Sequence, residues 1–155
     1  MKINNKGFTL VELIAVIVII AIIAAITTPR VIESFNQGKE SSYDIMINNI
    51  VTSSKAYYEE CQFGGLTHNG TSCSNEGTIN LTLNDLVNTG FLTGTNETAE
   101  DGTVTKVIKD PNTKEDIGSC SISITKAKEG QKYVYIVNST TSDEKCPKGQ
   151  LGRVN

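Results

Sequence analysis

The sequence predicts an α+β protein in which one long N-terminal α-helix packs against a small antiparallel β-sheet head. Three observations predict this fold. An apolar block fills residues 8–26, and a three- and four-residue spacing of apolar side chains continues to about residue 60. Short alternating segments separated by turn residues make up the rest. The 155 residues suffice for one compact domain and this additional helix.

The apolar block is long enough to cross a membrane. Residues 1–7 are polar and include Lys2 and Lys6, whereas the 19 residues Phe8–Ile26 contain one charge, Glu12. As a helix this block would be roughly 28 Å long, close to the ~30 Å of a bilayer's hydrocarbon core. Lysines before the block favour a cytoplasmic N-terminal side, with the bulk of the chain exported.

Two ordinary interpretations of the block leave Glu12 without a role. A secretory signal peptide has a shorter apolar region and a small-residue cleavage site, which Ala24 and Ala25 imitate loosely. A simple membrane anchor needs no carboxylate, and a charge at this depth costs roughly 3 kcal/mol. Snorkelling of Glu12 to the interface is the remaining structural explanation. We favour a functional carboxylate that needs a partner.

One short motif carries a family resemblance. The residues Lys6-Gly7-Phe8-Thr9-Leu10-Val11-Glu12-Leu13 resemble the class III signal peptide of type IV pilins and pseudopilins, and Pro29 matches a proline of that family. The resemblance implies cleavage between Gly7 and Phe8 by prepilin peptidase, N-methylation of Phe8, and subunit assembly through Glu12. It also implies the pilin fold for the chain as a whole.

The implied function is a structural subunit of a type IV pilus. A carboxylate in a low-dielectric environment needs a counter-charge, which the Phe8 amine of a neighbouring subunit would supply to Glu12. The implied partners are prepilin peptidase, other copies and minor pilins, the membrane assembly machinery and the lipid bilayer. The precursor would lie in the cytoplasmic (inner) membrane and the mature subunit in an extracellular fibre. Adhesion, twitching motility or DNA uptake would be properties of that fibre.

Two alternatives stay open. Within the family, the chain could be a pseudopilin of a type II secretion or competence (DNA uptake) system. In a different class, it could be a secreted or membrane-anchored binding module. We expect no enzyme, catalytic residue, cofactor or metal, because the sequence has no nucleophile, phosphate-loop or metal-hydrolase motif.

The charge balance excludes one class of partner. The chain has 14 basic and 17 acidic residues, a formal net charge of −3. Proteins that bind nucleic acid carry a basic face or tract that neutralises phosphates. We therefore expect no nucleic-acid binding by this subunit.

The predicted organisation has four parts: a leader peptide at 1–7, a transmembrane and polymerisation helix at 8–28, its amphipathic continuation at 29–60, and a globular head at 61–155. Pro29 removes a backbone donor and predicts a helix kink. In the amphipathic part, apolar residues recur at helical spacing and should pack on a sheet. They include Tyr43, Ile47, Ile50, Val51, Tyr57 and Tyr58.

The head is predicted as turns, one short helix and three strands. Residues 61–78 are rich in turn residues. Thr82 can cap a short helix that has Asp85 in its first turn and Gly90 at its end. Strands are predicted over residues 103–109, 117–125 and 132–138, with a hairpin turn at 128–131 and a polar tail at 139–155.

The cysteine pattern indicates disulfides. An even number of cysteines in an exported chain is typical of an oxidising compartment. The four cysteines are Cys61, Cys73, Cys120 and Cys146, and they allow three pairings. We favour Cys61–Cys73, which would staple the turn-rich loop to the helix end, and Cys120–Cys146. The latter would resemble the disulfide-closed C-terminal region of many pilins.

No metal site is expected in the head. A zinc site is disfavoured because the sequence has no CxxC pair and a single histidine, His68, which we interpret as a solvated loop residue. An oxygen-rich stretch could suggest calcium, but its spacing is not that of an EF-hand, so a solvated turn is favoured. That stretch contains Asp101, Asp110, Asn112, Glu115 and Asp116.

Overall fold

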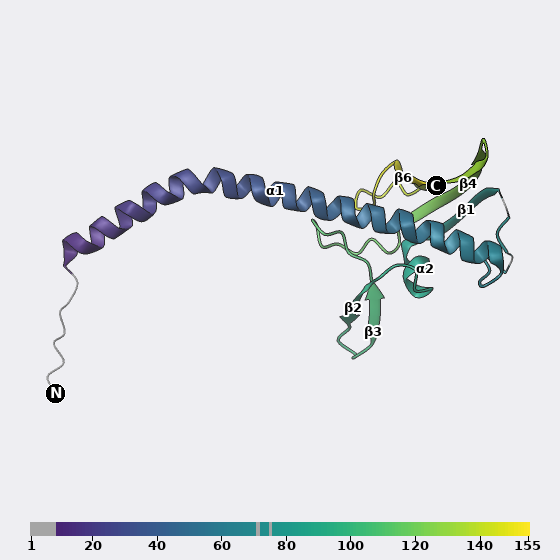
Figure 1. Ribbon diagram of the computed structural model, residues 1–155. Helices are drawn as coiled ribbons and strands as arrows, with labels where there is room; N and C mark the ends of the chain where they lie inside the picture. Colours follow the sequence, from purple (N-terminus) through teal and green to yellow (C-terminus); the bar gives the residue numbers. More distant parts are fainter. Residues whose placement is uncertain (1–8, 71, 75) are drawn as a thin grey trace, which may run out of the picture. The chain divides into compact units, whose positions relative to one another are not determined.

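The computed structural model describes residues 9–70, 72–74 and 76–155, and it confirms the predicted α+β class. Figure 1 shows one long helix with a small antiparallel sheet. The elements are α1 (Leu10–Phe63), β1 (Gly77–Thr82), α2 (Leu83–Asn88), β2 (Thr95–Thr98), β3 (Val104–Val107), β4 (Ser121–Glu129), β5 (Lys132–Ser139) and β6 (Gln150–Val154).

The chain divides into two compact units, Met1–Glu40 and Ser41–Asn155. The division falls inside α1, so the second unit contains the C-terminal part of the helix as well as the sheet. The four-part division at residues 7, 28 and 60 stays a prediction.

Among the described residues of the first unit, none packs against α1. Every described residue from 9 to 40 is exposed, including the apolar ones. The helix is assigned continuously through Pro29, and the predicted kink there stays a prediction. Just before Pro29, the hydroxyl of Thr27 donates to the Ile23 carbonyl at 2.9 Å and that of Thr28 to the Ala24 carbonyl at 2.6 Å. Such back-bonding is common where helices bend.

The second unit has its core between α1 and a four-stranded antiparallel sheet of order β1-β4-β5-β6. The helix contributes the predicted face, of which Ile50, Val51, Tyr57 and Tyr58 are buried. The sheet contributes alternate residues, since Ile124 on β4 lies opposite Ile79 and Val137. Figure 1 shows this sheet beside the teal part of α1.

The helix α2 forms as its sequence predicts. Thr82 is the N-cap, and it shares a reciprocal capping box with Asp85. The side chains of Leu83, Leu86 and Val87 are buried in the core. Its role is therefore packing.

Three strands were not predicted. The first, β1, begins at the end of the stretch interpreted as turns and pairs with β4 along its whole length. The second, β2, pairs only with β3. The third, β6, forms in the polar tail by pairing with β5, with Gly152 close to the Val51 side chain. Each depends on a partner strand elsewhere in the chain rather than on its own apolar pattern.

Two predicted boundaries were wrong. Strand β4 begins at Ser121 rather than at Ile117, because Ile117 and Cys120 form a turn in which the Cys120 N–H donates to the Ile117 carbonyl at 3.0 Å. The strand then continues to Glu129, which pairs with Lys132. The turn is therefore two residues long, with Gly130 at φ 64°, a conformation that favours glycine.

Candidate functional site

The start of α1 holds Glu12 in a capping box with Thr9. The backbone N–H and the hydroxyl of Thr9 both donate to Glu12 Oε2 at 3.0 Å. In return, the Glu12 N–H donates to Thr9 Oγ1 at 3.3 Å. This reciprocal arrangement satisfies two of the backbone donors that a helix start leaves free. Sequence reasoning missed it, although the Thr-x-x-Glu spacing is its usual signal.

The capping box orients the carboxylate and leaves one of its oxygens free. Both bonds from Thr9 end on Oε2, and among the described residues Oε1 of Glu12 accepts no hydrogen bond. The side chain can therefore cap its own helix and still accept a hydrogen bond, or pair with a cation, at Oε1. Gly7 and Phe8 lie outside the described residues, so the cleavage site and the Phe8 amine stay predictions.

Around Glu12, α1 presents apolar side chains in all directions. Leu10 and Val11 are about three-quarters exposed, and the isoleucines that follow are about half exposed. By length and composition, α1 is able to cross a membrane. A signal sequence has the same property. The arrangement favours packing into an apolar environment, with one carboxylate available for pairing.

Comparisons with known proteins match the same segment of the chain. The prokaryotic N-terminal methylation motif matches residues 2–28, which include the expected cleavage site and Glu12. The type IV major pilin protein PilA of Myxococcus xanthus (strain DK1622) is 38% identical over 57 residues, which are 37% of this chain and 26% of that protein. Over its N-terminal segment, the chain is therefore similar to type IV pilins.

The resemblance to known pilins does not extend over the whole chain. The chain matches about a quarter of the length of its Myxococcus relative, and no solved structure matches it.

Two disulfides hold loops of the second unit against its core. One joins Cys61 to Cys73, with the Cα atoms 5.2 Å apart, and holds the loop after α1 against the helix end. The other joins Cys120 to Cys146, with the Cα atoms 5.6 Å apart, and pins the segment between β5 and β6 beside the start of β4. Together these two bonds form one of the three pairings that four cysteines allow.

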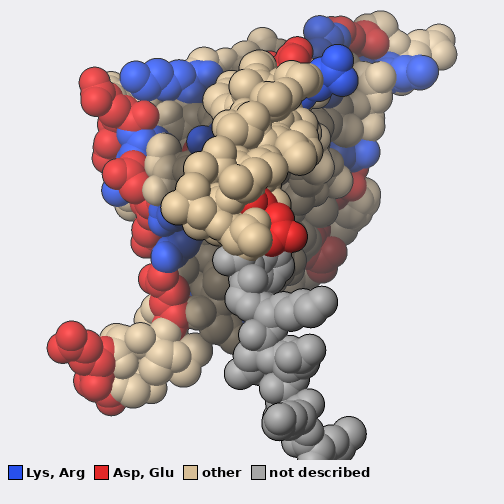
Figure 2. Space-filling model, turned by 90° about the vertical axis from the view of Figure 1, so that its left-hand side faces the viewer, with Lys and Arg blue, Asp and Glu red and all other residues tan. Residues whose placement is uncertain are grey.

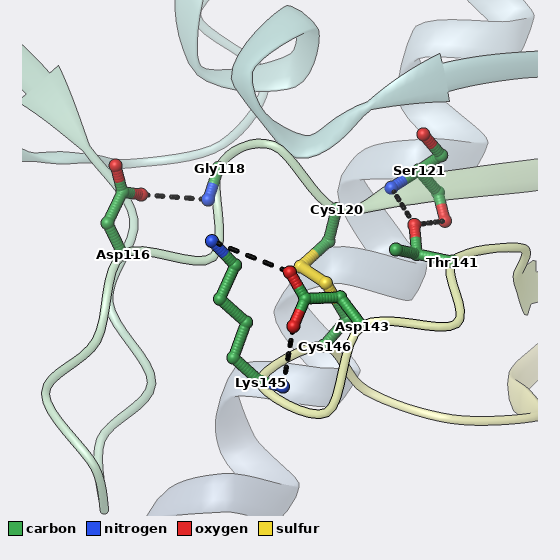
Figure 3. A network of polar contacts seen from close by, with 8 residues as sticks. All are labelled: Asp116, Gly118, Cys120, Ser121, Thr141, Asp143, Lys145 and Cys146. Atoms are coloured by element: carbon green, nitrogen blue, oxygen red, sulfur yellow. Dashed lines mark hydrogen bonds and ion pairs between the residues drawn. A yellow bond between two sulfur atoms is a disulfide. The ribbon is translucent and has the colours of Figure 1, made fainter.

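Polar contacts reinforce the second disulfide, as Figure 3 shows. The Ser121 N–H donates to Thr141 Oγ1 at 2.6 Å, which joins the same two segments. On the Cys146 side, Asp143 accepts the Lys145 N–H at 3.3 Å and lies 3.8 Å from Lys145 Nζ. The loop before β6 is thus held at several points.

His68 is less solvated than expected. It is half-buried, with Nδ1 3.2 Å from the Tyr57 hydroxyl and Nε2 3.2 Å from Asn69 Nδ2. Its ring meets the Tyr57 ring edge-on. The histidine therefore anchors the disulfide-closed loop to α1.

The oxygen-rich stretch uses its carboxylates to form turns. Asp110 is only 7% exposed, and its Oδ1 accepts the N–H groups of Asn112 at 2.7 Å and Thr113 at 2.9 Å. Asp116 accepts the Gly118 N–H at 2.8 Å (Figure 3). Among the described residues, no group of three or more potential ligands could hold a metal ion. Asp110 is thus buried, whereas the sequence suggested a solvated turn.

A buried lysine inside a cage of tyrosines was not predicted. Lys126 on β4 is 6% exposed, and its Nζ lies 4.6 Å, 5.2 Å and 5.9 Å from the ring centroids of Tyr133, Tyr135 and Tyr58. It also donates to the Gln62 side-chain carbonyl at the end of α1. Cation–π attraction offsets part of the cost of burying the ammonium group.

Proposed function

We propose that this chain is a structural subunit of a type IV pilus, cut between Gly7 and Phe8 and polymerised through residues 8–28. One observation carries the proposal: the apolar block of α1, exposed on all sides in the single chain, contains one carboxylate, Glu12. Lipid would cover this surface in the membrane, and neighbouring copies would cover it in the fibre.

The apolar surface supplies the driving force for packing. Removing apolar area from water contributes about 25 cal/mol per Å², so a fibre outside the membrane is stable only when its helices cover one another. Apolar packing alone does not fix how neighbouring helices align, because the hydrophobic effect is non-directional. Glu12 favours one alignment, because a buried carboxylate without a partner costs several kcal/mol.

The counter-charge in the proposal is the Phe8 amine of a neighbouring subunit. Because Thr9 occupies Oε2 of Glu12, Oε1 can accept the incoming amine while the helix cap stays intact. One pairing per subunit then sets the register between adjacent helices.

The first test is the mass of the mature chain in sheared surface filaments. The proposal requires a chain that begins at Phe8 and carries a methyl group on its amine. Replacing Gly7→Leu should leave uncut precursor in the membrane. A filament chain that begins near Thr27, or that keeps Met1, would contradict the proposal.

The second test separates processing from assembly. Glu12→Val should still be cut, because the cleavage residues are unchanged, but should be absent from the sheared fraction. Glu33→Val, on the exposed part of α1 beyond the apolar block, is the control and should assemble. Blotting of membrane and sheared fractions measures both steps. Normal assembly of Glu12→Val would refute the pairing.

A pilus is favoured over a pseudopilus by the C-terminal disulfide. The Cys120–Cys146 bond closes the region that is disulfide-closed in many pilins. Electron microscopy of sheared surface filaments labelled for this chain distinguishes the two, because a pilus extends from the cell surface.

A further inference from the structure

The hairpin formed by β2 and β3 has little support from the rest of its chain: among the described residues, α2 contacts β3 and Lys109 forms an ion pair with Glu97. The two strands pair only with each other, in a sheet separate from the main one. All residues from Thr95 to Lys106 are exposed except Glu97, which is half-buried, and Val104 is 59% exposed. A two-stranded hairpin is marginally stable in water unless something packs on it. This arm (residues 95–107) therefore presents a sheet that a partner could cover.

The tip of the arm is ordered and acidic. Its turn is closed by the Ala99 N–H, which donates to the Thr103 carbonyl at 2.8 Å, and by the Thr103 N–H, which donates to Asp101 Oδ1 at 2.9 Å. These bonds lower the pKa of Asp101, which favours its charged form. The neighbouring Glu100 has no ion pair or hydrogen bond among the described residues.

An unpaired basic surface lies at the end of the β4–β5 hairpin. Lys128 and Lys132 are exposed and form no ion pair among the described residues. The acidic residue between them, Glu129, is paired with Arg153. In Figure 1 the arm and the β4–β5 sheet extend to opposite sides of the helix that they share. Figure 2 shows acidic atoms on the lobe that projects at the lower left and several basic atoms along the upper edge.

We propose that the arm docks on the Lys128–Lys132 hairpin end of a neighbouring copy in the fibre, an inference that rests on the proposed function. Complementary charges are unpaired in one subunit and lie on different surfaces of it. A contact between unlike surfaces continues from copy to copy and forms an open polymer rather than a closed dimer. Charge pairs of this kind select register and exclude wrong orientations.

The direct test is carbodiimide cross-linking of sheared wild-type filaments, followed by peptide mass spectrometry. The expected bond joins the Glu100 or Asp101 carboxyl to the Nζ of Lys128 or Lys132. Detergent-dissociated subunits are the control and should not give it, because the two surfaces lie apart within one subunit. Absence of these peptides from filaments that do contain the chain would overturn the docking.

A charge-exchange experiment tests the same contact by assembly. Glu100→Lys with Asp101→Asn, which keeps an oxygen for the Thr103 N–H, should lower filament yield roughly fivefold. Combining this pair with Lys128→Glu and Lys132→Gln should restore the yield. The matched control, which makes the same change of charge elsewhere on the head, is Glu76→Lys with Glu144→Gln.

The outcomes separate the two proposals. Equal yields of the arm variant and its control would overturn the docking but leave the pilus subunit intact. Wild-type filaments without this chain would overturn the proposed function, and the docking with it.

Discussion

Tyr135 illustrates how the surroundings of one side chain determine its chemistry. It lies on β5 with its hydroxyl donating to Glu59 Oε1 at 3.1 Å. Burial, and secondly the charge of Glu59, raise the pKa of Tyr135 above its ordinary value. The folded protein therefore holds this proton more tightly than the unfolded chain does.

This shift predicts that stability falls at alkaline pH. The unfolded tyrosine ionises near pH 10, so the contribution of Tyr135 is complete below that pH and is lost as the pH rises toward the folded-state pKa. The slope reaches about 1.4 kcal/mol per pH unit for one proton. Urea unfolding between pH 8 and pH 11 measures it. Tyr135→Phe should flatten the slope relative to Tyr133→Phe, and equal slopes would contradict the prediction.

For single residues, the sequence was sufficient where the contact lies a few positions away along the chain. Thr82 was predicted as a helix cap and is one, because the partner of its side chain, Asp85, is three residues away. The environment of Lys126 was not predicted, because its tyrosines come from α1 and β5. Glu12 was found from its charge, but its cap with Thr9 came only from the structure.

Among elements, the Lys126 cage links α1, β4 and β5. On the core face of β4, Lys126 follows Ile122 and Ile124 at alternate positions, and it lies opposite Tyr135 on β5. Its stem continues the apolar face while its ammonium group meets the aromatic rings. The cage closes the end of the core beside the C-terminal end of α1.

Removing the charge should weaken this junction. Lys126→Met keeps the length of the side chain but loses the cation, and we expect it to lower the free energy of unfolding by about 1–2 kcal/mol. Lys126→Arg should lose less. The control is Lys128→Met, two residues along the same face but exposed, which should change stability by less than about 0.5 kcal/mol. Chemical denaturation measures all three, and a fully stable Lys126→Met would refute the role of the cage.

Strands were predictable where their own pattern was strong. Strand β5 was recognised from the alternation in residues 132–138 and has the bounds Lys132–Ser139. Strand β6 was not, because its residues are polar and it forms only by pairing with β5. Strand β4 begins later than predicted because residues 117–120 form a turn instead.

At the scale of the whole molecule, the two disulfides stabilise the second unit by constraining its unfolded chain. Cys61–Cys73 closes a separation of 12 residues, whereas Cys120–Cys146 closes one of 26. In the chain-entropy account, the longer loop constrains the unfolded chain more. The second bond also ties the start of β4 to the segment that leads into β6.

Removing the longer disulfide should therefore cost more. Replacing Cys120 and Cys146 by serine should lower the free energy of unfolding by about 3–4 kcal/mol. Replacing Cys61 and Cys73 by serine should cost about 0.7 kcal/mol less. Thermal unfolding of the two double variants compares them. The reverse order would show that native-state packing, and not loop length, dominates.

The sequence by itself determined the features of the N-terminal segment: the apolar block, its single carboxylate and the motif around Gly7 and Phe8. Those features depend on composition and on spacings of a few residues, which are visible along the chain. Only the tertiary structure decided the cage around Lys126, the strands β1 and β6, and the exposed arm formed by β2 and β3. Each of these depends on residues far apart in sequence, whose contacts form only when the chain folds.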